Sequence, residues 1–127
     1  MQEKYLYEYA IIRVLPQVER EEFLNVGIIL FCKKEKFISV RYLLNEEKLK
    51  LFSKDADVEQ IKQNLHSFEK IAQGTENCGP IALLDVPERF RWLTAVRSSV
   101  IQTSKTHPGL CNDLAKTANR LFEELVL

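Results

Sequence analysis

The chain has 127 residues, of which 46% are hydrophobic and 28% are charged, an ordinary balance for a globular domain. Eighteen Lys and Arg face eighteen Asp and Glu, so the basic excess typical of proteins that neutralise duplex nucleic acid is absent. The longest apolar run, residues 26–32, is far shorter than the roughly 20 residues that span a bilayer. We therefore expect a single domain over residues 1–127 that has neither a membrane nor a nucleic acid as its partner.

The cysteines and the first residues bear on cell compartment. The N-terminal residues lack the charged, apolar and small-residue regions of a signal peptide. The chain has three cysteines, an odd number, and without a secretion signal this favours free thiols in a reducing environment. We expect a cytoplasmic protein without disulfides.

Three strands are predicted at the start of the chain. Residues 5–15 alternate between the two faces of a strand, with apolar side chains on both, and Pro16 ends the pattern. Residues 24–32 are almost continuously apolar, as in a central strand buried on both faces, and Gly27 indicates a bulge or a close backbone approach. After a polar turn, residues 37–44 resume as a strand, which predicts an antiparallel hairpin.

The pattern then changes to helical spacing. Asn45 is the expected cap of a short helix that runs to about Phe52. Asp57, with Gln60 three residues later, is the expected cap of a longer helix that Gly74 closes. The apolar residues of the longer helix fall on one stripe: Val58, Ile61, Leu65, Phe68, Ile71 and Ala72.

The next segment mixes extended and helical signals. Residues 81–84 are expected as a short strand or an extended connector. Asp85, with Glu88 three residues on, predicts the start of a third helix that ends near Ala95. Residues 98–104 are predicted to form another strand.

A last helix begins at Asn112 or Asp113. Its apolar face is made by Leu114, Ala118, Leu121, Phe122 and Leu125. These elements predict an α+β fold, in which an antiparallel sheet of about four strands has helices packed mainly on one face. The expected core joins the central strand to the long helix through Val26, Ile28, Leu30, Ile61, Leu65 and Phe68.

Four segments carry a resemblance to a known family. They read YEYAIIRV at 7–14, EREEFLNVGIILFC at 19–32, ERFRWLTAVRSSVIQTS at 88–104 and HPGLC at 107–111. Together they resemble the bacterial domain-of-unknown-function family 3037 over almost the whole chain. The resemblance implies a small bacterial protein with no assigned activity, so no catalytic residue is carried over from it. Members are often encoded beside a HipA-like protein kinase, which implies a kinase as a partner.

Basic residues gather in one stretch of this otherwise neutral chain. Residues 88–111 contain a single acid, Glu88. The same stretch contains these basic residues: Arg89, Arg91, Arg97, Lys105 and His107. Arginines near hydroxyl groups are suited to hold a phosphate or a carboxylate through bidentate, charge-assisted hydrogen bonds. The candidate anion- or partner-binding residues are Arg91, Arg97, Ser99 and His107. In the alternative interpretation, the arginines form ion pairs with acids of a polar loop: Glu19, Glu21 and Glu22.

Cys111 and His107 are candidates for nucleophilic catalysis, because Cys111 precedes a predicted helix whose N-terminal dipole would activate a thiol. The alternative is a small apolar cysteine that packs in the interior. We favour the alternative and expect no catalytic residue.

Histidines and cysteines lack the close spacing of zinc sites, so we expect no metal and no cofactor.

The aromatic residues have two possible roles. Trp92, Phe90 and four tyrosines (Tyr5, Tyr7, Tyr9 and Tyr42) either stack against a partner or pack in the core, and packing is the more frequent role.

Two hypotheses about function follow. The first is a non-enzymatic interaction or regulatory module that acts with a kinase or another protein. The second is a small enzyme or ligand-binding domain that uses Arg91, Arg97, Ser99 and His107 on a phosphorylated or anionic substrate. A cleft in which the four side chains converge would favour the second hypothesis, and their separation would favour the first.

Overall fold

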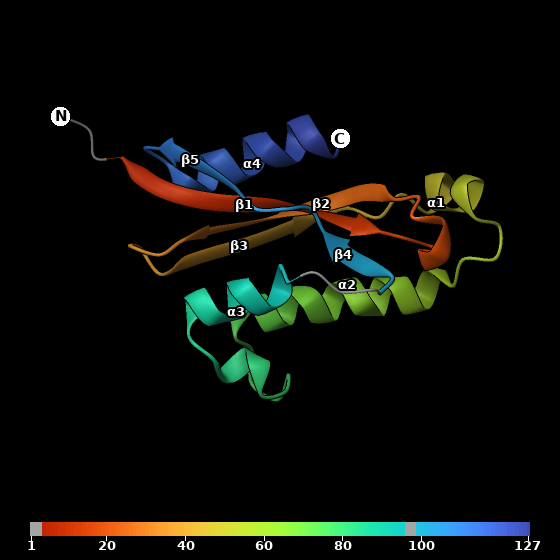
Figure 1. The fold of residues 1–127 in the computed structure, drawn as a ribbon, viewed down its shortest axis with the longest axis horizontal. Coiled ribbons are helices and arrows are strands. Elements are labelled where there is room, and N and C mark those ends of the chain that lie inside the picture. Colours follow the sequence, from red (N-terminus) through yellow and green to blue (C-terminus); the bar gives the residue numbers. More distant parts are fainter. Residues whose placement is uncertain (1–3, 96–98) are drawn as a thin grey trace.

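The computed structural model describes residues 4–95 and 99–127, in which one layer of strands lies between helices (Figure 1). The strands are β1 (Tyr5–Val14), β2 (Leu24–Cys32), β3 (Phe37–Tyr42), β4 (Ile101–Thr103) and β5 (His107–Cys111). The helices are α1 (Glu46–Phe52), α2 (Val58–Gln73), α3 (Val86–Leu93) and α4 (Leu114–Leu125), with short 3-10 turns η1 (Val18–Arg20) and η2 (Ile81–Leu83).

The sheet is antiparallel throughout the described residues, with the strand order β3-β2-β1-β4. β5 also pairs with β1, so β4 and β5 follow one another along the same side of that strand. This arrangement confirms the predicted α+β class and the antiparallel sheet. β4 is shorter than the predicted strand 98–104, whose residue 98 lies outside the described residues. β5 was not predicted, because Pro108 and Gly109 are poor strand formers.

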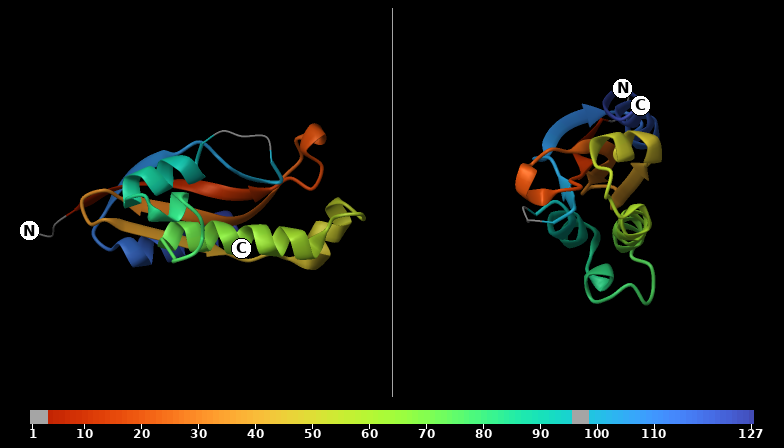
Figure 2. Two further views of the ribbon diagram at one scale, coloured as in Figure 1. Left: turned by 90° about the horizontal axis from the view of Figure 1, so that it is seen from below. Right: turned by 90° about the vertical axis from the view of Figure 1, so that its right-hand side faces the viewer.

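Helices cover the sheet on both sides. α2 and α3 lie against one face, and α4 lies against the other (Figures 1 and 2). The helices were expected mainly on one face, and α4 is the departure from that expectation. The physical reason lies in β1 and β2, whose apolar side chains point to both faces, so that a single layer of helices would leave one face exposed to water.

Two hydrophobic clusters form the core, one on each side of the sheet. The cluster facing α2 and α3 includes Val26, Ile29 and Phe31 of β2, with Ile61, Leu65 and Phe68 of α2. The cluster facing α4 includes Ile28, Leu30 and Cys32 of β2, with Leu114, Ala118 and Leu121 of α4. The predicted core set is therefore buried, but Ile28 and Leu30 do not pack against α2 as expected.

A β-bulge explains this division. In the β1–β2 register Ile12 lies opposite Gly27 while Arg13 lies opposite Asn25, so Val26 is an extra residue on β2. The extra residue shifts the alternation by one, so Val26 faces α2 and Ile28 faces α4. Gly27 also allows the close approach of β3, since a Cβ there would meet the Arg41 carbonyl and lie 2.7 Å from the Tyr42 Cβ. Both readings of Gly27 are confirmed.

The predicted helix starts are confirmed by their capping bonds. The side chains of four cap residues accept from the backbone N–H three residues on, at 3.0 to 3.1 Å: Asn45, Asp57, Asp85 and Asp113. Gly74 closes α2 in the left-handed conformation, at φ 68°. Gln60 does not return a bond to Asp57, because its side chain donates to Asn64 instead.

The prediction for residues 81–84 was wrong. This segment forms the 3-10 turn Ile81–Leu83, in which the Leu84 N–H donates to the Ile81 carbonyl at 3.1 Å. Pro80 precedes it with φ −67° and ψ −29°, which sets the chain in a helical rather than an extended direction. Within residues 4–95 and 99–127, no helix is long and apolar enough to cross a membrane.

Candidate functional site

A hollow of about 340 Å³ lies between α2, the end of α3 and β4. Its apolar lining comes from Phe68, Ile71, Trp92, Leu93, Ala95, Val100 and Ile101. Its polar lining comes from Asn64, Ser67, Ser99 and Gln102. None of these side chains is titratable in the physiological range, so the part of the hollow formed by the described residues offers mostly dispersion contacts and a few neutral hydrogen-bonding groups.

The walls of the hollow are held by both packing and hydrogen bonds. Phe68 and Leu93 are buried in the cluster beneath α2 and α3. Beside β4, the Ile11 N–H donates to the Ser104 Oγ and the Ser104 N–H donates to the Ile11 carbonyl, each at 2.8 Å. The Leu15 N–H adds a bond of 2.7 Å to the Val100 carbonyl. The segment is therefore anchored to β1 on both sides of β4.

Among the predicted site residues that the structure describes, Ser99 lines this hollow. Its Oγ donates to the Ile101 carbonyl at 2.5 Å, and the Gln102 side chain donates to the Ser99 carbonyl at 2.9 Å. The Asn64 Oδ1 accepts from Gln60 at 3.0 Å. These polar groups already form hydrogen bonds within the protein, so they stabilise the local fold and are less available to a ligand.

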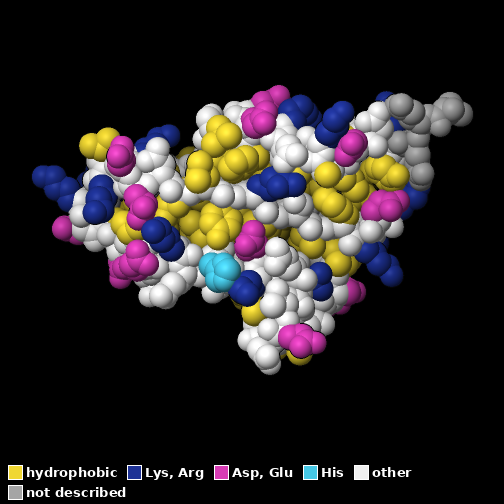
Figure 3. Space-filling model, turned by 180° about the vertical axis from the view of Figure 1, so that it is seen from behind, with side chains coloured by type: hydrophobic (Ala, Val, Ile, Leu, Met, Phe, Trp, Pro, Cys, Tyr) yellow, Lys and Arg dark blue, Asp and Glu magenta, His cyan; other side chains and the backbone are white. Residues whose placement is uncertain are grey.

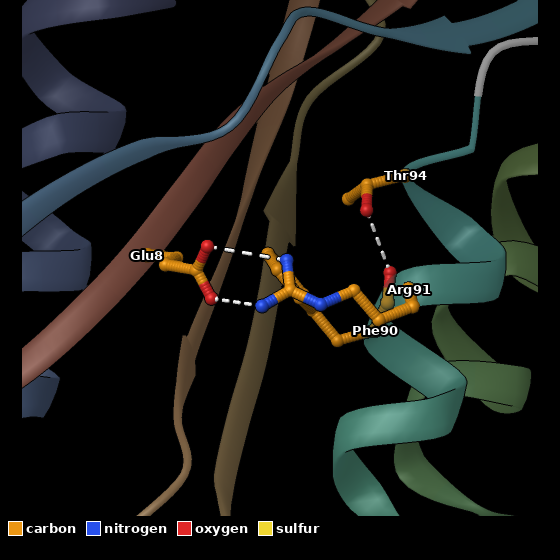
Figure 4. A network of polar contacts seen from close by, with 4 residues as sticks. All are labelled: Glu8, Phe90, Arg91 and Thr94. Atoms are coloured by element: carbon orange, nitrogen blue, oxygen red, sulfur yellow. Dashed lines mark hydrogen bonds and ion pairs between the residues drawn. The ribbon is translucent and has the colours of Figure 1, made fainter.

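Arg91 lies outside the hollow and binds Glu8 of β1. Its Nη1 and Nη2 donate to the two carboxylate oxygens of Glu8 at 3.1 and 2.6 Å, a bidentate pair that joins α3 to the sheet (Figure 4). The Arg91 side chain is 58% exposed and that of Glu8 is 28% exposed. The charge of Arg91 is therefore largely balanced within the protein.

Arg89 joins three segments of the chain. Its Nε donates to the Ala72 carbonyl at 3.2 Å, and its Nη1 donates to the Leu84 carbonyl at 2.6 Å. A cation at the end of α2 also interacts favourably with the helix dipole. Gly74 makes room for this side chain, because a Cβ there would lie 3.1 Å from the Arg89 Nη1.

For Arg91, the ion-pair alternative correctly predicted an ion pair but named the wrong acids, and its part on Arg97 lies outside the described residues. Glu22 pairs with Arg20 inside its own loop, and none of the loop's acids bonds to Arg89 or Arg91. The reason is distance, because the β1–β2 loop with η1 lies at the opposite end of the sheet from α3 (Figure 2).

His107 and Arg91 lie on opposite sides of the sheet. His107 pairs with Tyr9 in the β1–β5 register, and their rings are 5.3 Å apart on the α4 side. Glu8, the next residue along β1, points to the other side, where it meets Arg91. Of the four predicted binding residues, Arg91, Ser99 and His107 thus do not converge, and Arg97 lies outside the described residues.

Cys111 and His107 are too far apart for a catalytic pair. Both belong to β5, four residues apart, and a strand rises about 3.3 Å per residue, so roughly 13 Å separates them. Proton transfer needs hydrogen-bond contact. The cysteines are free, with Cys32 buried and Cys78 and Cys111 half-buried. No group of three or more potential metal ligands occurs among the described residues.

The tyrosines of β1 pack against the protein itself. Tyr7 is buried beside Gly109, and Tyr5 and Tyr9 are half-buried against the α4-side cluster. Tyr42 packs on the α2 side, where burial and then the charge of Glu69 raise its pKa above the ordinary value. The packing interpretation is therefore confirmed for these four side chains.

Two polar lining residues were missed at the sequence level. These are Asn64 and Ser67, three residues apart on α2. Trp92, which was considered for contact with a partner, lines the hollow at the end of α3 and is 38% exposed. The signal available was that Asn64 and Ser67 flank the apolar stripe, where a helix meets a neighbouring surface.

The fold and the hollow define a small α+β domain with a largely apolar surface depression. The chain belongs to the family described as "Protein of unknown function (DUF3037)", whose model matches residues 9–126. No curated protein and no solved structure matches the chain.

Proposed function

We propose that this protein is a non-enzymatic interaction module of the bacterial cytoplasm, in which the hollow between α2, α3 and β4 receives an apolar side chain or short segment of a partner protein. The observation that carries the proposal is the lining, which among residues 4–95 and 99–127 is mostly apolar and contains no titratable side chain. General acid–base catalysis requires such a group within reach of the reacting atoms. Apolar contact requires none.

The rim of the hollow has the composition of a binding surface. Trp92 is 38% exposed beside it, and tryptophan is among the residues that contribute most to protein–protein affinity. Ser67 is an exposed neutral residue of the lining, suited to hydrogen bonds with a partner backbone. Hydrogen bonds to β1 also fix the β4 segment that lines the hollow, so less conformational entropy is lost when a partner binds.

The partner that we propose is a HipA-like kinase. The support for this choice is family context, since members of this family are often encoded beside such a kinase. Under this proposal, the domain regulates the kinase by binding it and performs no chemistry of its own.

A substitution that fills the hollow tests the proposal. Ser67 and His66 are neighbouring exposed residues of α2, but only Ser67 lines the hollow. Ser67→Arg should weaken binding of the purified HipA-like kinase by about tenfold or more in titration calorimetry, the effect of losing one central contact. The control His66→Arg should bind like the wild type. Equal affinities of the two variants at unchanged melting temperatures would contradict the proposal.

The alternative, binding of a phosphorylated or anionic ligand by Arg91, Arg97, Ser99 and His107, has less support. The charge of Arg91 is balanced by Glu8, and His107 lies on the α4 side of the sheet. A melting temperature that rises with phosphate concentration, and does so less in Arg97→Ala, would favour this alternative over the interaction module.

A further inference from the structure

β3 is an edge strand with apolar side chains along its length. It ends the strand order of the sheet, and within the described residues no strand pairs with its outer side. All six residues of β3 are half-buried, and Leu43, which follows it, is 56% exposed. From behind the view of Figure 1, hydrophobic side chains form a broken band along the molecule (Figure 3).

The hydrogen-bond pattern shows which backbone groups of β3 are unpaired. The Leu43 N–H donates to the Val26 carbonyl at 2.8 Å, in continuation of the register that places Tyr42 opposite Gly27. Because antiparallel pairs alternate, residues in phase with Leu43 bond to β2. The N–H and C=O groups of the residues between them point outward: Ile38, Val40 and Tyr42.

A second copy of β3 fits this edge in one register. Pairing about a two-fold axis at Val40 places Val40 opposite its own copy and Ile38 opposite Tyr42, so all three outward-pointing residues are matched. Their side chains already pack on the α2 side, and the pairing would extend that row with apolar cross-strand contacts. Arg41 would face Ser39, so like charges would not meet.

The charges at the two ends of β3 are complementary in the same register. The turn before the strand contains three lysines and one acid, Glu35, and α1 after the strand begins with Glu46 and Glu47 ahead of Lys48 and Lys50. Lys33 and Glu47 are both exposed and both seven residues from Val40. The two-fold axis therefore brings each Lys33 to the same end of the interface as the Glu47 of the other copy. Glu46 is already bound to Lys62 at 3.0 Å, so Glu47 is the freer acid.

The opposite edge of the sheet is less suited to pairing. β4 has three residues, and β5 contains Pro108, which lacks an N–H. Pairing through β3 would thus produce a closed dimer rather than a chain of subunits.

We propose that two copies of this protein associate through antiparallel pairing of their β3 strands about a two-fold axis at Val40, which joins the two sheets into one. This surface lies at the edge opposite β4 and is separate from the hollow.

Charge reversal at the two ends of the strand tests the pairing by sedimentation equilibrium. The wild type should be a dimer in the micromolar to millimolar range. Lys33→Glu and Glu47→Lys should each weaken dimerisation by about tenfold, because two exposed contacts per dimer change from attraction to repulsion. An equimolar mixture of the two variants should recover the wild-type affinity, since both contacts are then attractive in the mixed dimer. The matched control Lys105→Glu, at the opposite edge, should dimerise like the wild type.

A backbone variant addresses the strand pairing itself. Val40→Pro removes an outward N–H, which an edge strand tolerates, and should abolish the dimer while the circular dichroism spectrum is retained. A protein that stays monomeric at every concentration would overturn the proposal. So would a dimer that both charge reversals leave unchanged, or a mixture of the two variants that associates no better than either alone. Capture of another protein's strand by a monomeric β3 edge would likewise overturn it.

Discussion

At the scale of single residues, the arginines of α3 show how burial and partners decide a role. Arg89 and Arg91 are two residues apart and looked alike as members of a basic stretch. Arg89 is half-buried and donates to two backbone carbonyls at the end of α2 and before α3. Arg91 is largely exposed and binds a single carboxylate. Arg89 therefore stabilises the fold, whereas Arg91 forms a surface ion pair between α3 and β1.

Substitution of the two arginines should separate these roles. Arg89→Ala leaves the carbonyls of Ala72 and Leu84 without their donors in a half-buried setting, and should lower the free energy of unfolding by about 1–3 kcal/mol. Arg91→Ala should cost less than about 1 kcal/mol, because solvent screens the exposed pair with Glu8. Urea denaturation measures both values. A larger loss for Arg91→Ala than for Arg89→Ala would show that the assignment is reversed.

At the scale of elements, the helices are defined by local signals, while their positions depend on the sheet. α2 and α4 both have a capping aspartate and one apolar face. They nevertheless lie on opposite sides, because β2 presents Ile29 and Phe31 to one face and Ile28 and Leu30 to the other. A sheet buried on both faces requires this sandwich of helices.

Truncation of one leucine in each cluster tests the two-sided core. Leu65→Ala on the α2 side and Leu30→Ala on the α4 side should each lower the free energy of unfolding by about 2–5 kcal/mol, since both side chains are fully buried. The control Leu51→Ala, at a position 90% exposed on α1, should change it by less than about 0.5 kcal/mol. Thermal or urea unfolding gives the comparison. A loss below about 1 kcal/mol for Leu30→Ala would show that α4 does not cover this face.

At the scale of the whole molecule, the reactivity of the three cysteines shows whether the helices stay packed on both faces of the sheet. Cys32 is fully buried at the end of β2 in the α4-side cluster, whereas Cys78 and Cys111 are half-buried. A thiol reagent reaches a buried sulfur through opening of the surrounding structure. The reactivity of Cys32 therefore depends on how often the α4 layer separates from the sheet.

Thiol titration without reductant should count three free cysteines in unfolded protein. In the native protein Cys78 and Cys111 should react first, and Cys32 should react at a rate that follows the opening of the fold. Mass spectrometry of partly labelled protein identifies the order. A count near one in the unfolded protein would reveal a disulfide, and early labelling of Cys32 would contradict its burial beneath α4.

Local signals in the sequence were enough for most elements. The strand at residues 24–32, the capped start of α2 at Asp57 and its end at Gly74 were all predicted as found. Strand alternation, capping and left-handed glycine ends involve residues within a few positions of each other, so one sequence carries them completely. Family membership also followed from contiguous segments.

Contacts between distant positions were decided by the tertiary structure. Glu8 became the partner of Arg91 because the sheet brings α3 beside β1, and nothing local to either residue indicates the other. The bulge at Val26 reversed the faces of Ile28 and Leu30, and pairing with β1 made a strand of residues 107–111 despite Pro108. Register between strands is a property of two segments at once. The sequence alone therefore determined most of the strands and helices, with residues 81–83 and 107–111 as the exceptions, while the packed sheet determined which side chains meet.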